Sequence, residues 1–146
     1  MFKRVISVFL SVLFLFGCMA VPAAAETSQD MSPYASNADN IYTKLSISSS
    51  GKATITIFCN KSSDKVTSMV AITYLQRKVG LIWVKVDNGL EGNKWREAYN
   101  YTNTMSKNYT IQLSKTGTYR VKTEYTIYET GKYPLVVERE CTATYN

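Results

Sequence analysis

The first chemical fact about this chain is that it contains no histidine. Histidine is the commonest general base and a frequent zinc ligand, so its absence removes the Ser–His and Cys–His nucleophile pairs and most zinc sites. No glycine-rich phosphate loop precedes a helical segment, and no EF-hand calcium loop occurs. The sequence therefore favours a protein that is not an enzyme and has neither a cofactor nor a metal site.

Carboxylates are the remaining catalytic chemistry, because a glycosidase needs only two acids. Asp87, Glu91 and Glu97 lie around the segment DNGLEGN, but their spacing matches no recognisable pair or cation loop. Glu138 and Glu140 lie on the expected outward face of the last strand, opposite Arg120, Lys122 and Glu124. That pattern indicates a cross-strand charge ladder on a solvated face. A hydrolase that uses acids alone is the least favoured hypothesis.

Aromatic residues supply the candidate binding surface. Trp95, Tyr99 and Tyr101 share one parity, and Arg96 lies between them. Exposed rings with polar neighbours suit the recognition of proteins or glycans. We therefore predict that these four residues bind a ligand, and that Trp95 is dispensable for stability. The alternative is that the rings pack in the core or at a sheet edge, as we expect for Trp83.

Two cysteines fall on inward faces of expected strands, Cys59 in KATITIFC and Cys141 in PLVVERECTATY. In an exported chain such a pair predicts one disulfide. A bridge that closes a loop of about eighty residues contributes about 4 kcal/mol by the chain-entropy model. The alternative is that Cys59 and Cys141 are two separate buried thiols.

The N-terminal 25 residues have the order of a secretory signal peptide. A basic pair, Lys3 and Arg4, precedes an apolar run from Val5 to Phe16, and Ala23-Ala24-Ala25 ends the segment. The run is shorter than the roughly 20 residues that span a bilayer. We predict cleavage between Ala25 and Glu26, which leaves a secreted, extracellular protein.

A second interpretation of the same segment involves Cys18. The sequence LFGC at residues 15–18 resembles a bacterial lipobox, in which the cysteine is lipidated and holds the chain at the membrane surface. Phe16 departs from the small residue that this pattern favours. A membrane is an expected partner only in this lipid-anchored alternative.

The charge of the chain bears on its partners. Loss of Lys3 and Arg4 with the signal lowers the formal net charge from +6 to +4. Basic and acidic residues are interspersed and form no basic stripe, which argues against nucleic-acid binding.

Residues 26–40 are rich in Ser, Asn, Asp and Ala without periodicity, which predicts a flexible leader. Residues 41–146 alternate between apolar and polar positions in short segments separated by turns, and no helical stripe occurs. In Val66–Gln76 the expected inward residues are Val66, Val70, Ile72 and Tyr74. The pattern predicts an all-β antiparallel sandwich of seven to eight strands.

Two short segments resemble parts of immunoglobulin-like domains. GTYRV at residues 117–121 resembles the strand that carries the tyrosine corner, and GLIWV at residues 80–84 resembles the exit of the third strand in variable-type domains. Val121 replaces the second antibody cysteine, and Ile72 lies near the position of the core tryptophan. More closely, the arrangement is similar to small secreted β-sandwich proteins of Gram-positive bacteria, a mostly uncharacterised group. The resemblance implies a single immunoglobulin-like sandwich outside the cell and implies no activity.

These observations together predict a non-enzymatic extracellular module that binds a protein or a glycan through loops and exposed aromatic residues. The alternative is a structural or assembly protein of the cell surface that associates through strand edges. A monomer with a ligand favours the first hypothesis, whereas concentration-dependent oligomers favour the second.

Overall fold

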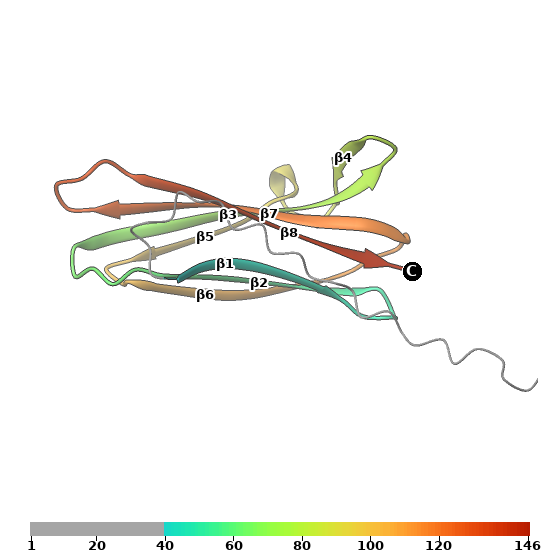
Figure 1. Ribbon diagram of the computed structural model, residues 1–146, viewed down its shortest axis with the longest axis horizontal. Coiled ribbons are helices and arrows are strands. Elements are labelled where there is room, and N and C mark those ends of the chain that lie inside the picture. The colour runs from blue at the N-terminus through green and yellow to red at the C-terminus, as the bar shows by residue number, and fades with distance from the viewer. Residues whose placement is uncertain (1–39) are drawn as a thin grey trace, which may run out of the picture.

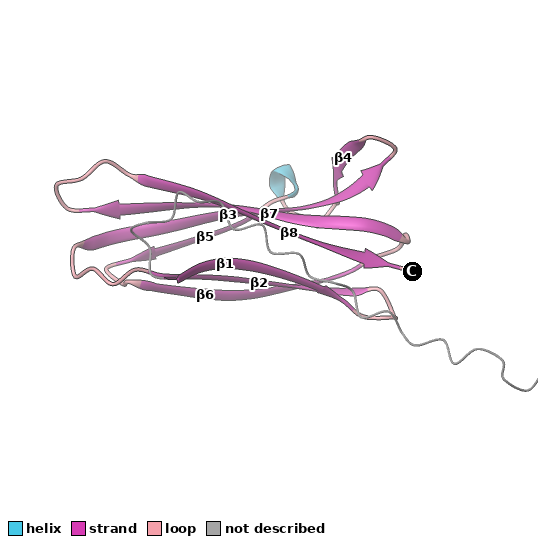
Figure 2. Ribbon diagram, viewed as in Figure 1, coloured by secondary structure: helices cyan, strands magenta, loops and turns pink. Residues whose placement is uncertain are grey.

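The structure, a computed structural model, describes residues 40–146 and consists of two antiparallel β-sheets packed face to face (Figure 1). The predicted cleavage site at Ala25 and Glu26, the lipobox Cys18 and nearly all of the leader lie outside the described residues. Eight strands and one short 3₁₀ turn make up the fold (Figure 2): β1 (Asn40–Ile47), β2 (Lys52–Asn60), β3 (Val66–Val79), β4 (Ile82–Lys85), η1 (Glu91–Asn93), β5 (Trp95–Asn100), β6 (Thr104–Gln112), β7 (Gly117–Glu129) and β8 (Leu135–Tyr145).

One sheet has the strand order β1-β2-β6, and the other has the order β4-β3-β7-β8, with β5 also paired to β3. All pairings are antiparallel. The predicted all-β sandwich is therefore confirmed. β1 begins at Asn40, one residue before the expected start of the domain.

β4 and β5 occupy the same edge of β3 one after the other. Residues 82–85 pair with the end of β3, and residues 95–100 pair with its first half. Between them the amide of Val86 still donates to the carbonyl of Leu75, at 2.8 Å. Residues 87–94, which we call the excursion loop, therefore leave a nearly continuous strand and return to it. In Figure 1 this loop, which contains η1, rises above the sheet.

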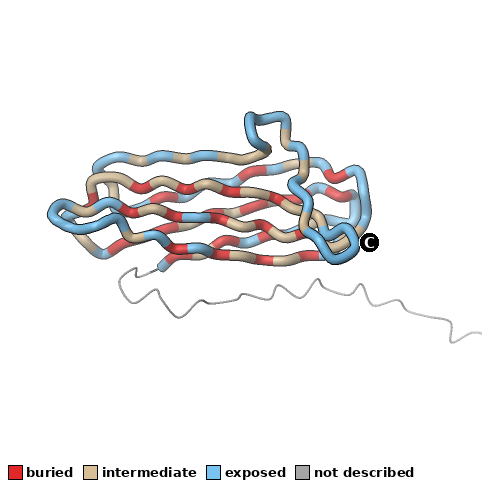
Figure 3. Tube along the Cα trace, turned by 90° about the horizontal axis from the view of Figure 1, so that it is seen from above, coloured by how far each residue is buried: buried red, intermediate tan, exposed pale blue. Residues whose placement is uncertain are grey.

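The core lies between the sheets and follows the alternation of the strands (Figure 3). Along β7 every second side chain is buried, as predicted: Tyr119, Val121, Thr123, Tyr125 and Ile127. Arg139 is a charged residue on the otherwise largely apolar inward face of β8, and it is also buried; its Nε donates to the carbonyl of Ile41 at 3.1 Å. A buried guanidinium needs such a partner, because an unpaired buried charge is strongly destabilising.

Buried hydroxyl groups are paired both within a sheet and between the two sheets. Thr73 and Thr123 are both fully buried, and their hydroxyl oxygens lie 3.0 Å apart. The hydroxyl of Tyr125 donates to the carbonyl of Tyr42 at 2.8 Å and lies 2.9 Å from that of Thr43. Burial raises the pKa of the Tyr125 phenol. These bonds satisfy polar groups that would otherwise cost stability in the core.

The predicted inward face of β3 is wrong over most of the strand. Val66 is buried as expected, but the buried positions after it are Met69, Ala71, Thr73 and Leu75. The pairing of β3 with β7 shifts register between Val66 and Ser68. A bulge of this kind moves all later side chains to the opposite face.

The predicted disulfide is absent, because the structure has Cys59 and Cys141 as free, buried thiols. Cys59 of β2 lies opposite Ile41 of β1. The β8 residue that contacts the backbone of Ile41 is Arg139, and not Cys141. Cys141 lies two residues further along β8, where its thiol contacts the backbone of Leu45. The two cysteines therefore face the core at different heights, and the alternative of two separate thiols describes the structure.

Candidate binding site

Trp95 is not the exposed anchor that the sequence predicts. Its ring is half-buried, packs against the core and stacks on Tyr109 of β6, with ring centroids 5.1 Å apart and planes at 19°. Trp95 therefore helps to close the edge of the sandwich between β5 and β6.

Two further side chains of β5 complete the same closure. A carboxylate oxygen of Glu97 accepts from the hydroxyl of Tyr109 at 3.1 Å and lies 3.7 Å from Nζ of Lys107. The hydroxyl of Tyr99 donates to the carbonyl of Ser106 at 3.4 Å. Burial, followed by the Glu97 charge, raises the pKa of Tyr109. We call this group of contacts the β5–β6 seam. The polar groups of its side chains bond to other residues of β5 and β6.

The other two predicted binding residues are exposed but are not brought together with the rings of the seam. Arg96 points to the opposite face of β5. Tyr101 is 88% exposed and has a φ of +53°, in the loop after β5. The predicted cluster is thus divided between an internal seam and a loop tip.

A different surface stands out in the structure, at the turn between β3 and β4. Exposed large apolar side chains are concentrated there, within residues 79–84: Val79, Leu81, Ile82 and Val84. Leu81 is 97% exposed and Ile82 is 63% exposed. We call residues 79–84 the apolar hairpin. Contiguous exposed apolar groups on a protein surface indicate an interaction site.

The geometry of the apolar hairpin explains this exposure. Val79 pairs with Ile82 across a two-residue turn, and Gly80 has a φ of +60° that suits the first central position of a II′ turn. In Figure 1 the hairpin bends away from the sheet formed by β1, β2 and β6. Side chains that continue the inward face of β3 therefore leave the core and meet solvent.

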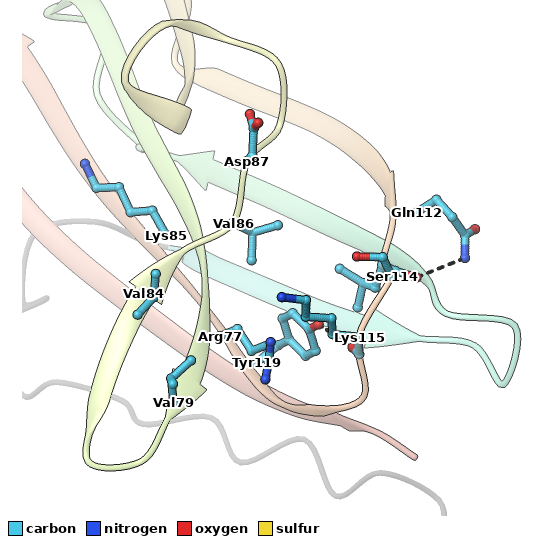
Figure 4. Close-up of a pocket in the computed structure, with 11 residues that line it drawn as sticks. Arg77, Val79, Val84, Lys85, Val86, Asp87, Gln112, Ser114, Lys115 and Tyr119 are labelled. Carbon is cyan, nitrogen blue, oxygen red and sulfur yellow. Dashed lines mark hydrogen bonds between the residues drawn. The ribbon is translucent and has the colours of Figure 1, made fainter.

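A pocket of about 360 Å³ lies beside the hairpin (Figure 4). Val79, Val84 and Val86 supply its apolar wall, and Lys115 and Ser114 come from the loop between β6 and β7. Its lining residues are Arg77, Val79, Val84, Lys85, Val86, Asp87, Gln112, Leu113, Ser114, Lys115 and Tyr119.

The floor of the pocket is basic. Arg77 and Lys115 lie beside Tyr119 in Figure 4, whereas the carboxylate of Asp87 projects away from them. Nε of Arg77 is buried and has no hydrogen-bond partner within residues 40–146. Burial raises the pKa of the Tyr119 phenol, and the charge of Arg77 opposes that rise. This end of the sandwich is suited to an anionic group beside an apolar one.

The outer face of the hairpin is built differently. The guanidinium of Arg120 lies 4.5 Å from the ring centroid of Trp83, and the ammonium of Lys85 lies 4.3 Å from that of Tyr74. Nη1 of Arg120 also contacts Glu140 at 3.2 Å. The Arg120 contact holds Trp83 as a half-buried ring on the outer face of the edge strand β4.

The predicted charge ladder is present between β7 and β8. Nζ of Lys122 lies 2.7 Å from a carboxylate oxygen of Glu138 and 3.7 Å from one of Glu140. Exposed pairs of this kind contribute little individually, roughly 0–1 kcal/mol. The ladder keeps this face solvated.

The loop carboxylates take separate roles. Glu97 belongs to the β5–β6 seam, and Asp87 accepts a bond from the Gly89 amide at 2.9 Å. Asp87 is the single carboxylate among the residues that line the pocket. Within residues 40–146, no group of three or more His, Cys, Asp or Glu side chains could hold a metal ion. The arrangement can bind by apolar contact and positive charge.

Comparison with known proteins finds no family model that matches the chain and no curated protein that matches its sequence. Across the part of the chain that the structure describes, no helix is long and apolar enough to cross a membrane.

The apolar hairpin was missed at the sequence level, although a signal for it exists. VGLIWV is apolar at consecutive positions around a glycine, where a strand with one wet face would alternate. It also lies between Arg77-Lys78 and Lys85. We interpreted Gly80–Val84 as part of a strand exit, which left its exposure unexamined.

Proposed function

We propose that the protein is a secreted, non-enzymatic binding module that uses the apolar hairpin and the adjacent pocket as its binding face. The observation that carries this proposal is that four large apolar side chains are exposed within the six residues 79–84: Val79, Leu81, Ile82 and Val84. The turn between β7 and β8 also exposes large side chains, Tyr128, Tyr133 and Val136, but two of these carry a polar hydroxyl. The hairpin therefore offers the larger gain from removal of water.

The scaffold of this module is proposed to be immunoglobulin-like. The order β1-β2-β6 in one sheet and β4-β3-β7-β8 in the other corresponds to strands A-B-E and C′-C-F-G of such domains. The hydroxyl of Tyr119 donates to the carbonyl of Lys115, four residues earlier. A tyrosine hydroxyl bonded to the backbone a few residues upstream is a feature of the tyrosine corner of such domains, and it supports the proposal.

The experiment that tests the binding face replaces Leu81 and Ile82 together with aspartate. We expect this variant to lose at least about tenfold in attachment to cell envelopes, because two exposed apolar contacts become charged. Attachment is measured by co-sedimentation of the purified protein with envelopes of the producing cells.

The matched control is Tyr133→Asp, because Tyr133 is also 97% exposed but lies in the turn between β7 and β8. We expect the control to attach like the wild type and both variants to keep the wild-type melting temperature. Equal attachment of all three proteins would disprove the proposed face.

A second candidate function, assembly through strand edges, is favoured by one observation. β1 and β8 each pair with a single strand within the described residues, and β8 is 11 residues long. Such edges are templates for pairing with another chain. Light scattering over a range of concentrations separates the candidates, since a monomer at all concentrations excludes edge assembly and leaves the binding face.

A further inference from the structure

We propose that the apolar hairpin docks the protein on an anionic lipid surface, with its tip in the interfacial layer of the bilayer and its flanking cations on the headgroups. The inference rests on the proposed function, because it names the partner of the same face. It requires neither a membrane-spanning segment nor a lipid on Cys18.

The shape of the tip favours a lipid surface over a folded protein. Leu81 lies in the two-residue turn and Ile82 directly follows it; both are exposed, and the hairpin bends away from the body of the sandwich (Figure 1). A convex apolar tip needs a concave apolar partner wall on a protein. A bilayer interface accepts such a tip without a matching wall, because acyl chains rearrange around it.

Charge complementarity identifies the lipid as anionic. Arg77 and Lys78 directly precede Val79, the last residue of β3, and Lys85 ends β4 directly after the apolar hairpin. Lys115 adds a fourth cation from the neighbouring loop. Anionic headgroups attract basic residues held close to the membrane surface.

The acidic side chains nearest the hairpin are Asp87 and Glu91 of the excursion loop and Glu140, which is paired with Arg120 at 3.2 Å beside Trp83. Asp87 is engaged by the amide of Gly89 and projects away from Arg77 and Lys115 (Figure 4). Cations therefore dominate the approach around the tip, and a guanidinium such as that of Arg77 is suited to a phosphate oxygen.

The order of side chains along the hairpin matches the polarity of a bilayer interface. The tip carries Leu81 and Ile82, the next position carries Trp83, and Lys78 lies directly opposite Trp83. Tryptophan is enriched at the level of the headgroups, and lysine reaches outward from that level. From tip to base the hairpin is thus apolar first, then carries Trp83 and Lys78 at one level, and then Arg77 opposite Val84.

The experiment uses the fluorescence of Trp83 as a depth probe. The chain has two tryptophans, and Trp95→Phe leaves Trp83 as the reporter while an aromatic ring remains against Tyr109. The probe surfaces are phosphatidylcholine vesicles and vesicles of phosphatidylcholine mixed with phosphatidylglycerol, each with and without brominated acyl chains. All proteins are compared in one processed form, whose N-terminus is established by intact mass.

We expect the emission of Trp83 to shift to shorter wavelength and to be quenched by brominated lipid on the anionic vesicles. The same signal should be much weaker on pure phosphatidylcholine and should fall as salt is added. In this background, Leu81→Asp with Ile82→Asp should lower vesicle binding at least about tenfold. Tyr133→Asp should leave vesicle binding unchanged.

Absence of quenching on anionic vesicles would overturn the proposal, as would equal binding of the hairpin variant and the wild type. Equal binding to neutral and anionic vesicles would overturn the assignment of an anionic surface. If the hairpin variant loses envelope attachment while no vesicle binds the wild type, the lipid proposal fails and the proposed binding face stands. If neither assay distinguishes the variant, both proposals fail.

Discussion

At the scale of single residues, the structure reverses the role that the sequence predicts for Trp95. An aromatic residue with polar neighbours has the same local pattern whether it faces solvent or covers a sheet edge. The ring is half-buried because β6 places Tyr109 against it, and that neighbour lies on another sheet. Such a partner is set by tertiary packing and is invisible in the local sequence.

Trp95→Ala is therefore expected to destabilise the fold and to leave attachment intact. Removal of a fully buried large aromatic side chain costs about 3–5 kcal/mol, so a half-buried one should cost about 2 kcal/mol. The measurement is the free energy of unfolding in denaturant, with Tyr133→Ala as an exposed control that should change it little. An unchanged free energy combined with lost attachment would restore Trp95 as a binding residue.

The buried thiols give a second prediction at this scale. Burial raises the pKa of the Cys59 thiol from its usual 9.0 to about 11, and burial also raises the pKa of Cys141. The folded state therefore favours the neutral thiols. The stability that comes from keeping the Cys59 thiol neutral is complete below pH 9.0, and it is lost as the pH rises toward about 11.

We expect the folded protein at about pH 8 to resist alkylation at both positions, because little thiolate forms. Unfolding without reductant should make the peptides that contain Cys59 and Cys141 fully reactive in mass spectrometry. The denaturant concentration at the unfolding midpoint should decrease as the pH is raised from 9.0 to about 11. This decrease should be smaller in Cys59→Ala. A linked pair of these two peptides would instead establish the disulfide.

At the scale of elements, the alternation of β7 was predictable because one strand face meets the core over its whole length. The face of β3 was not, since the bulge near Thr67 changes the parity within one strand. The exposure of the apolar hairpin was not predictable either. The alternation of apolar and polar residues shows which side chains share a face of a strand. It does not show where the opposing sheet ends, and therefore which of those side chains are left exposed.

The excursion loop gives a prediction about elements. Val86 bonds to Leu75 and Trp95 pairs with Thr73, so one residue opposite Tyr74 would complete the strand. Replacement of residues 87–94 by a single glycine should therefore retain the fold, with a change in melting temperature of only a few degrees. Circular dichroism during heating measures this change. Loss of cooperative unfolding would show that the loop is required for the pairing of β4 or β5 with β3.

At the scale of the whole molecule, the two ends of the sandwich differ in chemistry. The apolar hairpin and its cations lie at one end, and the turn between β7 and β8 lies at the other (Figure 1). At that second end Glu129 pairs with Lys132 at 2.7 Å and with Lys61 at 3.7 Å, so much of its charge is neutralised locally. This asymmetry supports the proposal of a single binding face.

The most direct test of that face places a photo-cross-linking amino acid at position 81 or at position 133, which are equally exposed in the structure. Each protein is irradiated on cell envelopes, and covalent adducts are measured by mass spectrometry. The proposed face predicts adducts with an envelope component from position 81 and few from position 133. Equal adducts from both positions, or adducts from position 133 alone, would contradict it.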